Sequence, residues 1–205
     1  MEQTTKVSDQ IEGWLRGDGP KTLGSLTELF EEKSFAVIFV ILLGVPALPL
    51  PTGGATHVFE VIAMLLSLQL IVGRDAVWLP QRWCRLKLEG PTQKRFVNAL
   101  LKMVRFLERF SRPRLRWVFD TRVGNSLFGV VVLLLSIAAF VAPPFSGLDT
   151  LPALGAVVVS LGVLLEDFAV VVAGIVMGAA GAFLEVVLGK AALKGVKHLF
   201  SVLVR

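Results

Sequence analysis

The stretch FAVIFVILLGVPALPL, from Phe35 to Leu50, contains no charged residue and is followed by a third proline, Pro51, and by the glycine pair Gly53-Gly54. A further apolar run from Val58 to Val72 follows, with Glu60 and Gln69 as its polar members. Apolar runs separated by prolines and glycines predict two helices joined by an irregular turn. We therefore expect a broken helical hairpin that lies in a membrane, because neither run carries a polar face for water.

A second broken hairpin follows further along the chain, with apolar runs at 128–143 and 151–165. The two hairpins align without a gap at an offset of 93 residues, which pairs prolines, glycines and serines in one register: Pro51 with Pro144, Gly54 with Gly147, and Ser67 with Ser160. This coincidence favours two copies of one unit. The alternative is two unrelated hairpins that both need proline and glycine to turn.

The apolar limbs are short for a membrane crossing. A limb of 15 or 16 residues spans about 24 Å as a helix, whereas a bilayer core is about 30 Å thick and calls for about 20 residues. Two arrangements remain open. The limbs are either re-entrant hairpins whose tips meet inside the bilayer, or tight spans whose Pro/Gly breaks lie near one surface.

Composition supports a lipid environment, with 54% hydrophobic and 18% charged residues and a mean hydropathy of +0.72. The positive charge is concentrated, since 13 of the 21 Lys and Arg residues lie between Arg74 and Arg122. Part of this block has helical periodicity, with Leu100, Val104 and Leu107 on an apolar face and basic residues on the other. The positive-inside rule places the block in the cytoplasm. Membrane segments bracket it, so we do not expect nucleic acid as a partner.

We therefore expect an all-α, polytopic integral protein of a bacterial inner membrane. Its segments are an N-terminal amphipathic part (1–33), hairpin repeat 1 (34–75), a basic amphipathic linker (76–127), hairpin repeat 2 (128–167), a C-terminal membrane helix (168–189) and a basic amphipathic tail (190–205). A cytoplasmic linker makes the two repeats parallel. If every limb spans, the basic tail lies outside, so either the tail folds back or some limbs are re-entrant. The small residues Gly174, Gly178 and Ala182 predict close helix packing, within the chain or between protomers.

The sequence does not predict an enzyme. Two histidines and one cysteine cannot furnish a zinc site, and the lone glycine pair lacks the following Lys-Ser/Thr of a phosphate-binding loop, so we expect no cofactor. The candidate substrate-binding residues are polar or small residues beside the breaks: Thr52, Gly53, Gly54, Thr56, Glu60, Ser146, Gly147 and Asp149.

Two kinds of candidate stand out among these residues. Thr56 and Asp149 stand where N-caps would begin the second limb of each repeat. They either simply cap those helices or mark helix N-termini that would attract an anion. Glu60 is costly in lipid and predicts a partner, a cavity or water beside it.

Several stretches resemble one known family: QLIVGRDAVWLP from Gln69 to Pro80, the preceding Pro-Leu-Pro-Thr-Gly, Pro144-Phe145, Leu151-Pro152-Ala153, Leu107-Glu108-Arg109 and Arg112-Pro113-Arg114. They resemble the ExoD family of exopolysaccharide-synthesis membrane proteins, over about Leu26 to Leu188. Two places differ from the family pattern. Asp149-Thr150 stands where an Asn is usual, and Glu166-Asp167-Phe168 lacks the usual Arg and Gly.

The resemblance implies a role in making or exporting surface polysaccharide. We expect a transport-type role, in which a lipid-linked sugar or a small anionic solute binds between the repeats. The alternative is a non-catalytic assembly subunit that docks polysaccharide-synthesis enzymes through the basic linker. An intramembrane enzyme that uses Glu60 and Asp149 as acid and base is the least favoured, because no nucleophile is at hand. Expected partners are membrane lipids, an anionic lipid or lipid-linked saccharide, and a second copy or other polysaccharide-synthesis proteins.

Overall fold

The computed structural model describes residues 6–30, 33–48, 56–74, 76–85, 91–111, 121–143 and 146–203. Within these ranges the regular structure is helical throughout. The helices are α1 (Val7–Arg16), α2 (Leu23–Leu29), α3 (Ser34–Gly44), α4 (His57–Ile71), α5 (Gln81–Cys84), α6 (Pro91–Phe110), α8 (Arg122–Val141), α9 (Thr150–Leu164) and α10 (Phe168–Leu203). The expected all-α class is confirmed for the described residues.

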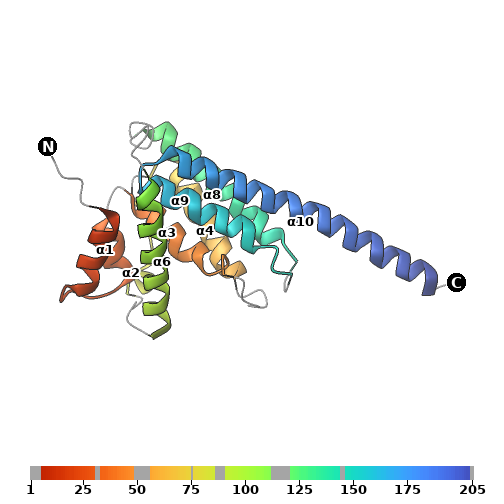
Figure 1. Ribbon diagram of the computed structural model, residues 1–205, viewed down its shortest axis with the longest axis horizontal. Coiled ribbons are helices and arrows are strands. Elements are labelled where there is room, and N and C mark those ends of the chain that lie inside the picture. Colours follow the sequence, from red (N-terminus) through yellow and green to blue (C-terminus); the bar gives the residue numbers. More distant parts are fainter. Residues whose placement is uncertain are drawn as a thin grey trace.

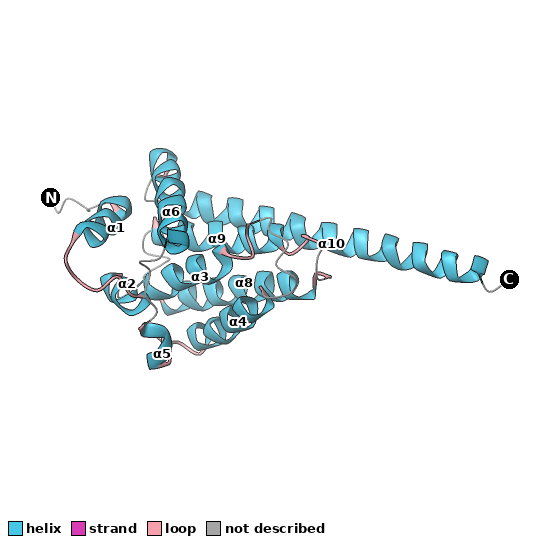
Figure 2. Cartoon of the chain, turned by 90° about the horizontal axis from the view of Figure 1, so that it is seen from below, coloured by secondary structure: helices cyan, strands magenta, loops and turns pink. Residues whose placement is uncertain are grey.

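Five helices, α3, α4, α8, α9 and α10, form an elongated bundle (Figures 1 and 2). α6 lies across one end of the bundle, where α1, α2 and α5 also gather. α3 and α8 run from this end towards the Pro/Gly breaks, and α4 and α9 run back from the breaks. The ends of α3 and α8 and the starts of α4 and α9 therefore lie at the end of the bundle opposite α6.

The two hairpins interlock, because the first limb of each packs on the second limb of the other. α3 packs mainly against α9, and α4 packs mainly against α8. α3 and α9 are almost wholly buried, which explains why their sequences lack a polar face. At the crossing of the two first limbs, the Phe39 and Phe128 rings meet edge to face with centroids 5.6 Å apart. These contacts make one core from the two halves of the chain.

α4 and α9 match in their bounds and in their internal bonding. Each has 15 residues, and their first and last residues differ by 93 in number. In α4 the buried Ser67 hydroxyl donates to the carbonyl four residues earlier at 2.8 Å, and the buried Ser160 hydroxyl in α9 does the same at 2.8 Å. The two helices are therefore built alike at equivalent positions.

The C-terminal ends of α4 and α9 also close in the same way. Gly73 has φ +92° and Glu166, 93 residues later, has φ +56°. The following N–H in each case bonds back across the last turn, Arg74 to Gln69 at 3.1 Å and Asp167 to Gly162 at 2.9 Å. This left-handed ending usually needs glycine. At the end of α9 the non-glycine residue Glu166 adopts it.

The outer faces of the bundle expose many large apolar side chains. Two helices, Arg122–Val141 and Phe168–Gly189, are long and apolar enough to cross a membrane, and most of each is unburied. Exposed examples are Val58 and Leu65 on α4, Leu134 on α8, and Val176 and Phe183 on α10. α3, α4 and α9 are apolar but shorter. This surface fits association with lipid.

The small residues of α10 pack inside the chain. A Cβ on Gly155 of α9 would lie 2.4 Å from the Gly178 Cα, and one on Gly174 would lie 2.5 Å from the Val159 nitrogen. The two backbones are thus in direct contact, as the small-residue pattern predicted. α10 also continues unbroken from Phe168 to Leu203, so the described tail does not fold back after residue 189.

Candidate functional site

The starts of α4 and α9 meet at the break end of the bundle. Thr56 and Asp149 are the N-cap residues, as expected, but neither side chain bonds to the N–H groups of its own helix. Instead the Thr56 hydroxyl donates to Asp149 Oδ2 at 3.5 Å, although 93 residues separate them. The simple capping interpretation is therefore wrong for both side chains. Their contact joins two positions that are 93 residues apart, one in each hairpin.

Glu60, in the first turn of α4, lies beside this contact. It is fully buried, and its Oε2 lies 2.7 Å from His57 Nδ1. The His57 ring in turn packs against Phe140 of α8, with centroids 5.1 Å apart. Glu60 Oε1 is buried and has no hydrogen-bond partner among the described residues. The expectation that Glu60 has a partner is confirmed in His57, and one carboxylate oxygen remains to accept a further bond.

A third carboxylate comes from α10 and was not among the predicted site residues. Glu185 lies close enough to Asp149 and Glu60 for their charges to interact, and its Oε1 is buried without a partner among the described residues. It is four residues beyond the buried Gly181 and so continues the face of α10 that packs on α9. That periodicity was visible in the sequence and could have identified Glu185.

We call Thr56, His57, Glu60, Asp149 and Glu185 the carboxylate cluster. Among the described residues no three His, Cys, Asp or Glu side chains are arranged to hold a metal ion. The three carboxyl groups offer no positive charge to an anion, so the cluster suits an anionic group less well than the helix N-termini alone would. Carboxylate oxygens accept hydrogen bonds, and hydroxyl groups are good donors to them. The arrangement thus suits a ligand rich in hydroxyls.

The remaining predicted site residues do not join the cluster as side-chain ligands. The exposed Ser146 hydroxyl donates to the Pro143 carbonyl at 2.6 Å and accepts from Leu148 N at 3.2 Å, which shapes the turn before α9. Gly147 has φ +67°, a conformation that favours glycine. Both therefore serve the local backbone. Thr52, Gly53 and Gly54 lie outside the described residues.

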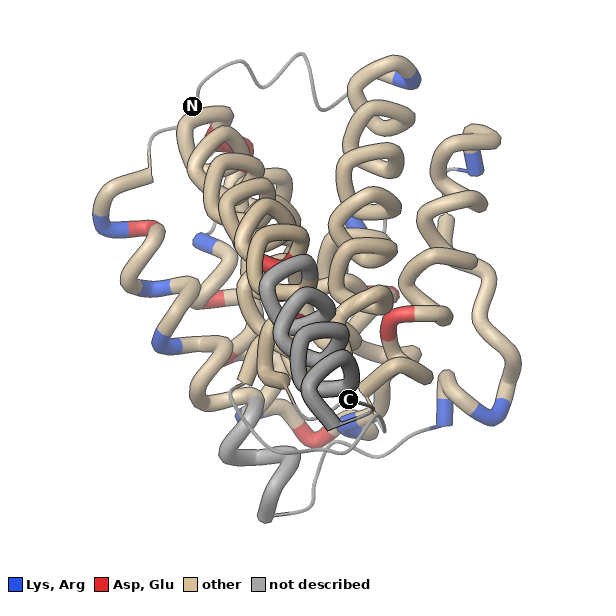
Figure 3. Tube along the Cα trace, turned by 90° about the vertical axis from the view of Figure 1, so that its right-hand side faces the viewer, with Lys and Arg blue, Asp and Glu red and all other residues tan. Residues whose placement is uncertain are grey.

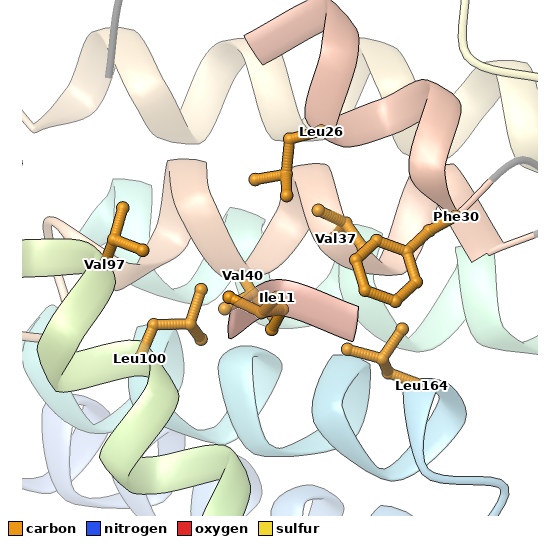
Figure 4. A pocket seen from close by; sticks show the side chains of 8 residues that line it. All are labelled: Ile11, Leu26, Phe30, Val37, Val40, Val97, Leu100 and Leu164. Atoms are coloured by element: carbon orange, nitrogen blue, oxygen red, sulfur yellow. The ribbon is translucent and has the colours of Figure 1, made fainter. Parts of the chain in front are cut away.

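The opposite end of the bundle has different chemistry. A narrow pocket there lies between α1, α2, α3, α6 and the end of α9 and is lined by apolar side chains alone (Figure 4): Ile11, Leu26, Phe30, Val37, Val40, Val97, Leu100 and Leu164. Close to it in the chain, Lys33 Nζ lies 2.5 Å from Glu166 Oε1 and ties the start of α3 to the end of α9. The pocket offers no polar group to a sugar, so the carboxylate cluster is the better candidate.

Comparison with known proteins places this fold in a family. The family model described as "Exopolysaccharide synthesis, ExoD" matches residues 7–187. Protein ExoD of Rhizobium meliloti is 29% identical over 206 residues, covering 95% of this chain and 83% of the relative. An uncharacterized protein of Synechocystis sp. is 30% identical over 154 residues, which is 75% of this chain and 72% of that protein. No solved structure matches. With the family model spanning most of its length, this chain belongs to the ExoD family.

Proposed function

We propose that this protein is a multi-pass inner-membrane protein of exopolysaccharide synthesis, built from two copies of one helical hairpin. Family membership supports the process. The 93-residue offset shared by the bounds, serine bonds and helix ends of α4 and α9 supports the duplication. The apolar outer faces of α4, α8 and α10 support the membrane placement. In this placement the α6 end is cytoplasmic, because α5, α6 and the adjoining ends of α4 and α8 carry Arg82, Lys102, Arg105, Arg109, Arg74 and Arg122, and the less basic end of α10 lies on the other side.

The role we propose is the transport of a lipid-linked sugar, whose hydroxyl groups bind at the carboxylate cluster. One observation carries this proposal. The two hairpins meet through Thr56 and Asp149, and beside that meeting point lies the buried Oε1 of Glu60, which has no hydrogen-bond partner among the described residues. Transporters built from repeats often bind their substrates where broken helices of the two repeats meet. A small anionic solute is less favoured, because the cluster is acidic.

The depth of the cluster fits the handling of a lipid-linked sugar. Glu185 is 17 residues beyond Phe168, the first residue of α10, which is about 26 Å along a helix. A hydrocarbon core is about 30 Å thick. The cluster therefore lies near the face of the bilayer opposite α6. A sugar headgroup that reaches this face leaves its lipid tail along the exposed apolar surface of α4 or α10.

The test replaces Glu60 by Gln in the full-length protein. We expect flux of a fluorescent lipid-linked sugar across liposomes, and polysaccharide output in cells, to fall at least tenfold. Such a loss matches about 1.4 kcal/mol or more, the scale of a hydrogen bond to a charged group. Glu28→Gln, at an exposed carboxylate on α2, is the matched control and should keep full flux. Folded protein is measured by its thermal transition in detergent.

Each outcome for Glu60→Gln has a definite meaning. Loss of flux with the thermal transition intact supports the binding role. Loss of the folded protein assigns Glu60 to the architecture, and unchanged flux removes the residue from the site. The proposed topology has its own test, because periplasmic labelling of a cysteine placed at Arg105 in a Cys84→Ser background would contradict it.

A further inference from the structure

α6 has one more apolar surface than its sequence pattern predicts. Its buried face consists of Val97, Leu100, Leu101 and Val104, which pack on the protein. Phe106 and Phe110 point elsewhere and are 64% and 67% exposed. Their rings contact each other with centroids 5.3 Å apart. The two rings therefore form an exposed patch that is separate from the packed face of α6.

Exposed basic side chains lie beside this patch along α6. Lys102, Arg105 and Arg109 are all exposed on α6. Arg105 pairs with Glu12 of α1, whereas Lys102 and Arg109 form no ion pair within the part of the chain that the structure describes. In a view along the bundle, Lys and Arg residues line the outer edge of α6, at the rim of the molecule (Figure 3). We call Lys102, Phe106, Arg109 and Phe110 the outer stripe of α6.

The helix is held firmly in this orientation. Glu108, one turn along from Arg105, accepts hydrogen bonds from the Ser8 nitrogen at 2.9 Å and the Ser8 hydroxyl at 2.5 Å. Together with the Arg105–Glu12 pair, these bonds dock α1 on α6. The outer stripe therefore faces away from α1 by construction, and the exposure of its two aromatic rings does not result from a loose helix.

We propose that the outer stripe of α6 binds the anionic phosphate headgroups of the cytoplasmic leaflet, with Phe106 and Phe110 inserted beneath them. This rests on the membrane placement proposed above. α6 crosses the end of the bundle (Figure 1), and in the proposed placement this orientation is parallel to the membrane plane. On such a helix, aromatic rings can insert at the boundary between headgroups and acyl chains, and basic residues are attracted by the negative surface potential of anionic lipids. A neutral protein partner would not need the basic residues, which is why the lipid is the favoured occupant.

The experiment measures amide hydrogen exchange of residues 97–110 in full-length protein reconstituted in phosphatidylcholine vesicles, with and without phosphatidylglycerol. We expect exchange to slow when phosphatidylglycerol is present and to recover at high salt. Lys102→Gln with Arg109→Gln should lower the protection factor gained from phosphatidylglycerol by up to about 30-fold, given about 1 kcal/mol for each basic residue near an anionic surface. Phe106→Ser with Phe110→Ser should speed exchange in both lipids.

The matched control is Arg16→Gln, which removes an exposed charge from α1 and should leave the lipid response unchanged. Equal exchange in both lipids would overturn the proposal, as would a phosphatidylglycerol effect that persists in Lys102→Gln/Arg109→Gln. Loss of polysaccharide output in that variant, with no lipid effect at all, would assign the stripe to a protein partner. The hydrogen-exchange measurements do not depend on sugar flux. A negative flux result would therefore contradict the transport proposal without affecting the lipid-binding proposal.

Discussion

Gly155→Ala should be among the most damaging small substitutions in the chain, because the added methyl group on α9 would overlap the backbone of α10. The new Cβ would lie 2.4 Å from the Gly178 Cα, 2.6 Å from the Gly178 nitrogen and 2.9 Å from the Gly174 carbonyl oxygen. Ordinary contact begins at 3.4 Å, so α9 and α10 would have to separate by about 1 Å. No side chain can rotate away to relieve this overlap.

The magnitude follows from two opposing effects. Overpacking typically costs about 1–3 kcal/mol, and we expect the upper end because the overlapping atoms belong to the backbone. Alanine gains about 1 kcal/mol over glycine inside a helix. The net loss is about 2 kcal/mol, which lowers the unfolding midpoint by roughly 4–8 °C in a protein of this size. The same separation moves Glu185 away from Asp149, so sugar flux should fall as well.

Thermal unfolding of the purified protein in one detergent checks the prediction against two controls. Gly178→Ala meets mainly the Leu135 side chain, whose nearest atom would lie 2.5 Å away but can move, so its loss should be smaller. Gly13→Ala has nothing within 4 Å and should stabilise α1 slightly. From highest to lowest, the expected order of unfolding midpoints is Gly13→Ala, wild type, Gly178→Ala and Gly155→Ala. A Gly155→Ala midpoint equal to that of wild type would refute the close α9–α10 contact.

Glu166→Gly should keep the unfolding midpoint within a few degrees of wild type, because relief of the positive φ offsets the lost pair with Lys33, whereas Glu166→Ala loses the pair without that relief and should melt lower. The reverse order would contradict the strain argument. Glu108→Ala should reduce the stability of docked α1 by about 1–2 kcal/mol, because it removes the acceptor for the Ser8 nitrogen and hydroxyl at the start of that helix. The loss should appear as faster hydrogen exchange in residues 7–16. Unchanged exchange would show that α1 docks without Glu108. Thr56→Asp should reduce sugar flux by adding charge beside Asp149, and exchanging the two residues as Thr56→Asp with Asp149→Thr should recover most of it if the positions are equivalent; no recovery would count against equivalence.

The bounds of several helices could be predicted from local pattern. α3 ends at Gly44 and α8 ends at Val141, each two residues before a proline, because proline cannot donate to a helix and clashes with the preceding turn. The apolar run at 151–165 predicted α9 almost to the residue. The contact of Gly174 and Gly178 with α9 was also foreseeable, since small residues four apart allow backbones to approach. These features depend on residues that are close in sequence.

The functional geometry depended on contacts across the chain. Asp149 and Thr56 have the residue types of caps, and only the approach of α9 to α4 turns one side chain towards the other. Glu185 joins Glu60 and Asp149 because α10 remains one straight helix over the intervening turns and packs its glycine face on α9. Periodicity showed that α6 has an apolar side, but the neighbouring helices decided which apolar residues are buried and left Phe106 and Phe110 outside. Sequence pattern therefore predicts which segments are helical and which carry apolar faces, because those properties are local, although α3 ends before its apolar run does and α10 continues beyond residue 189. Which polar groups meet is decided by tertiary packing, because it sums many weak contacts between residues far apart in the chain.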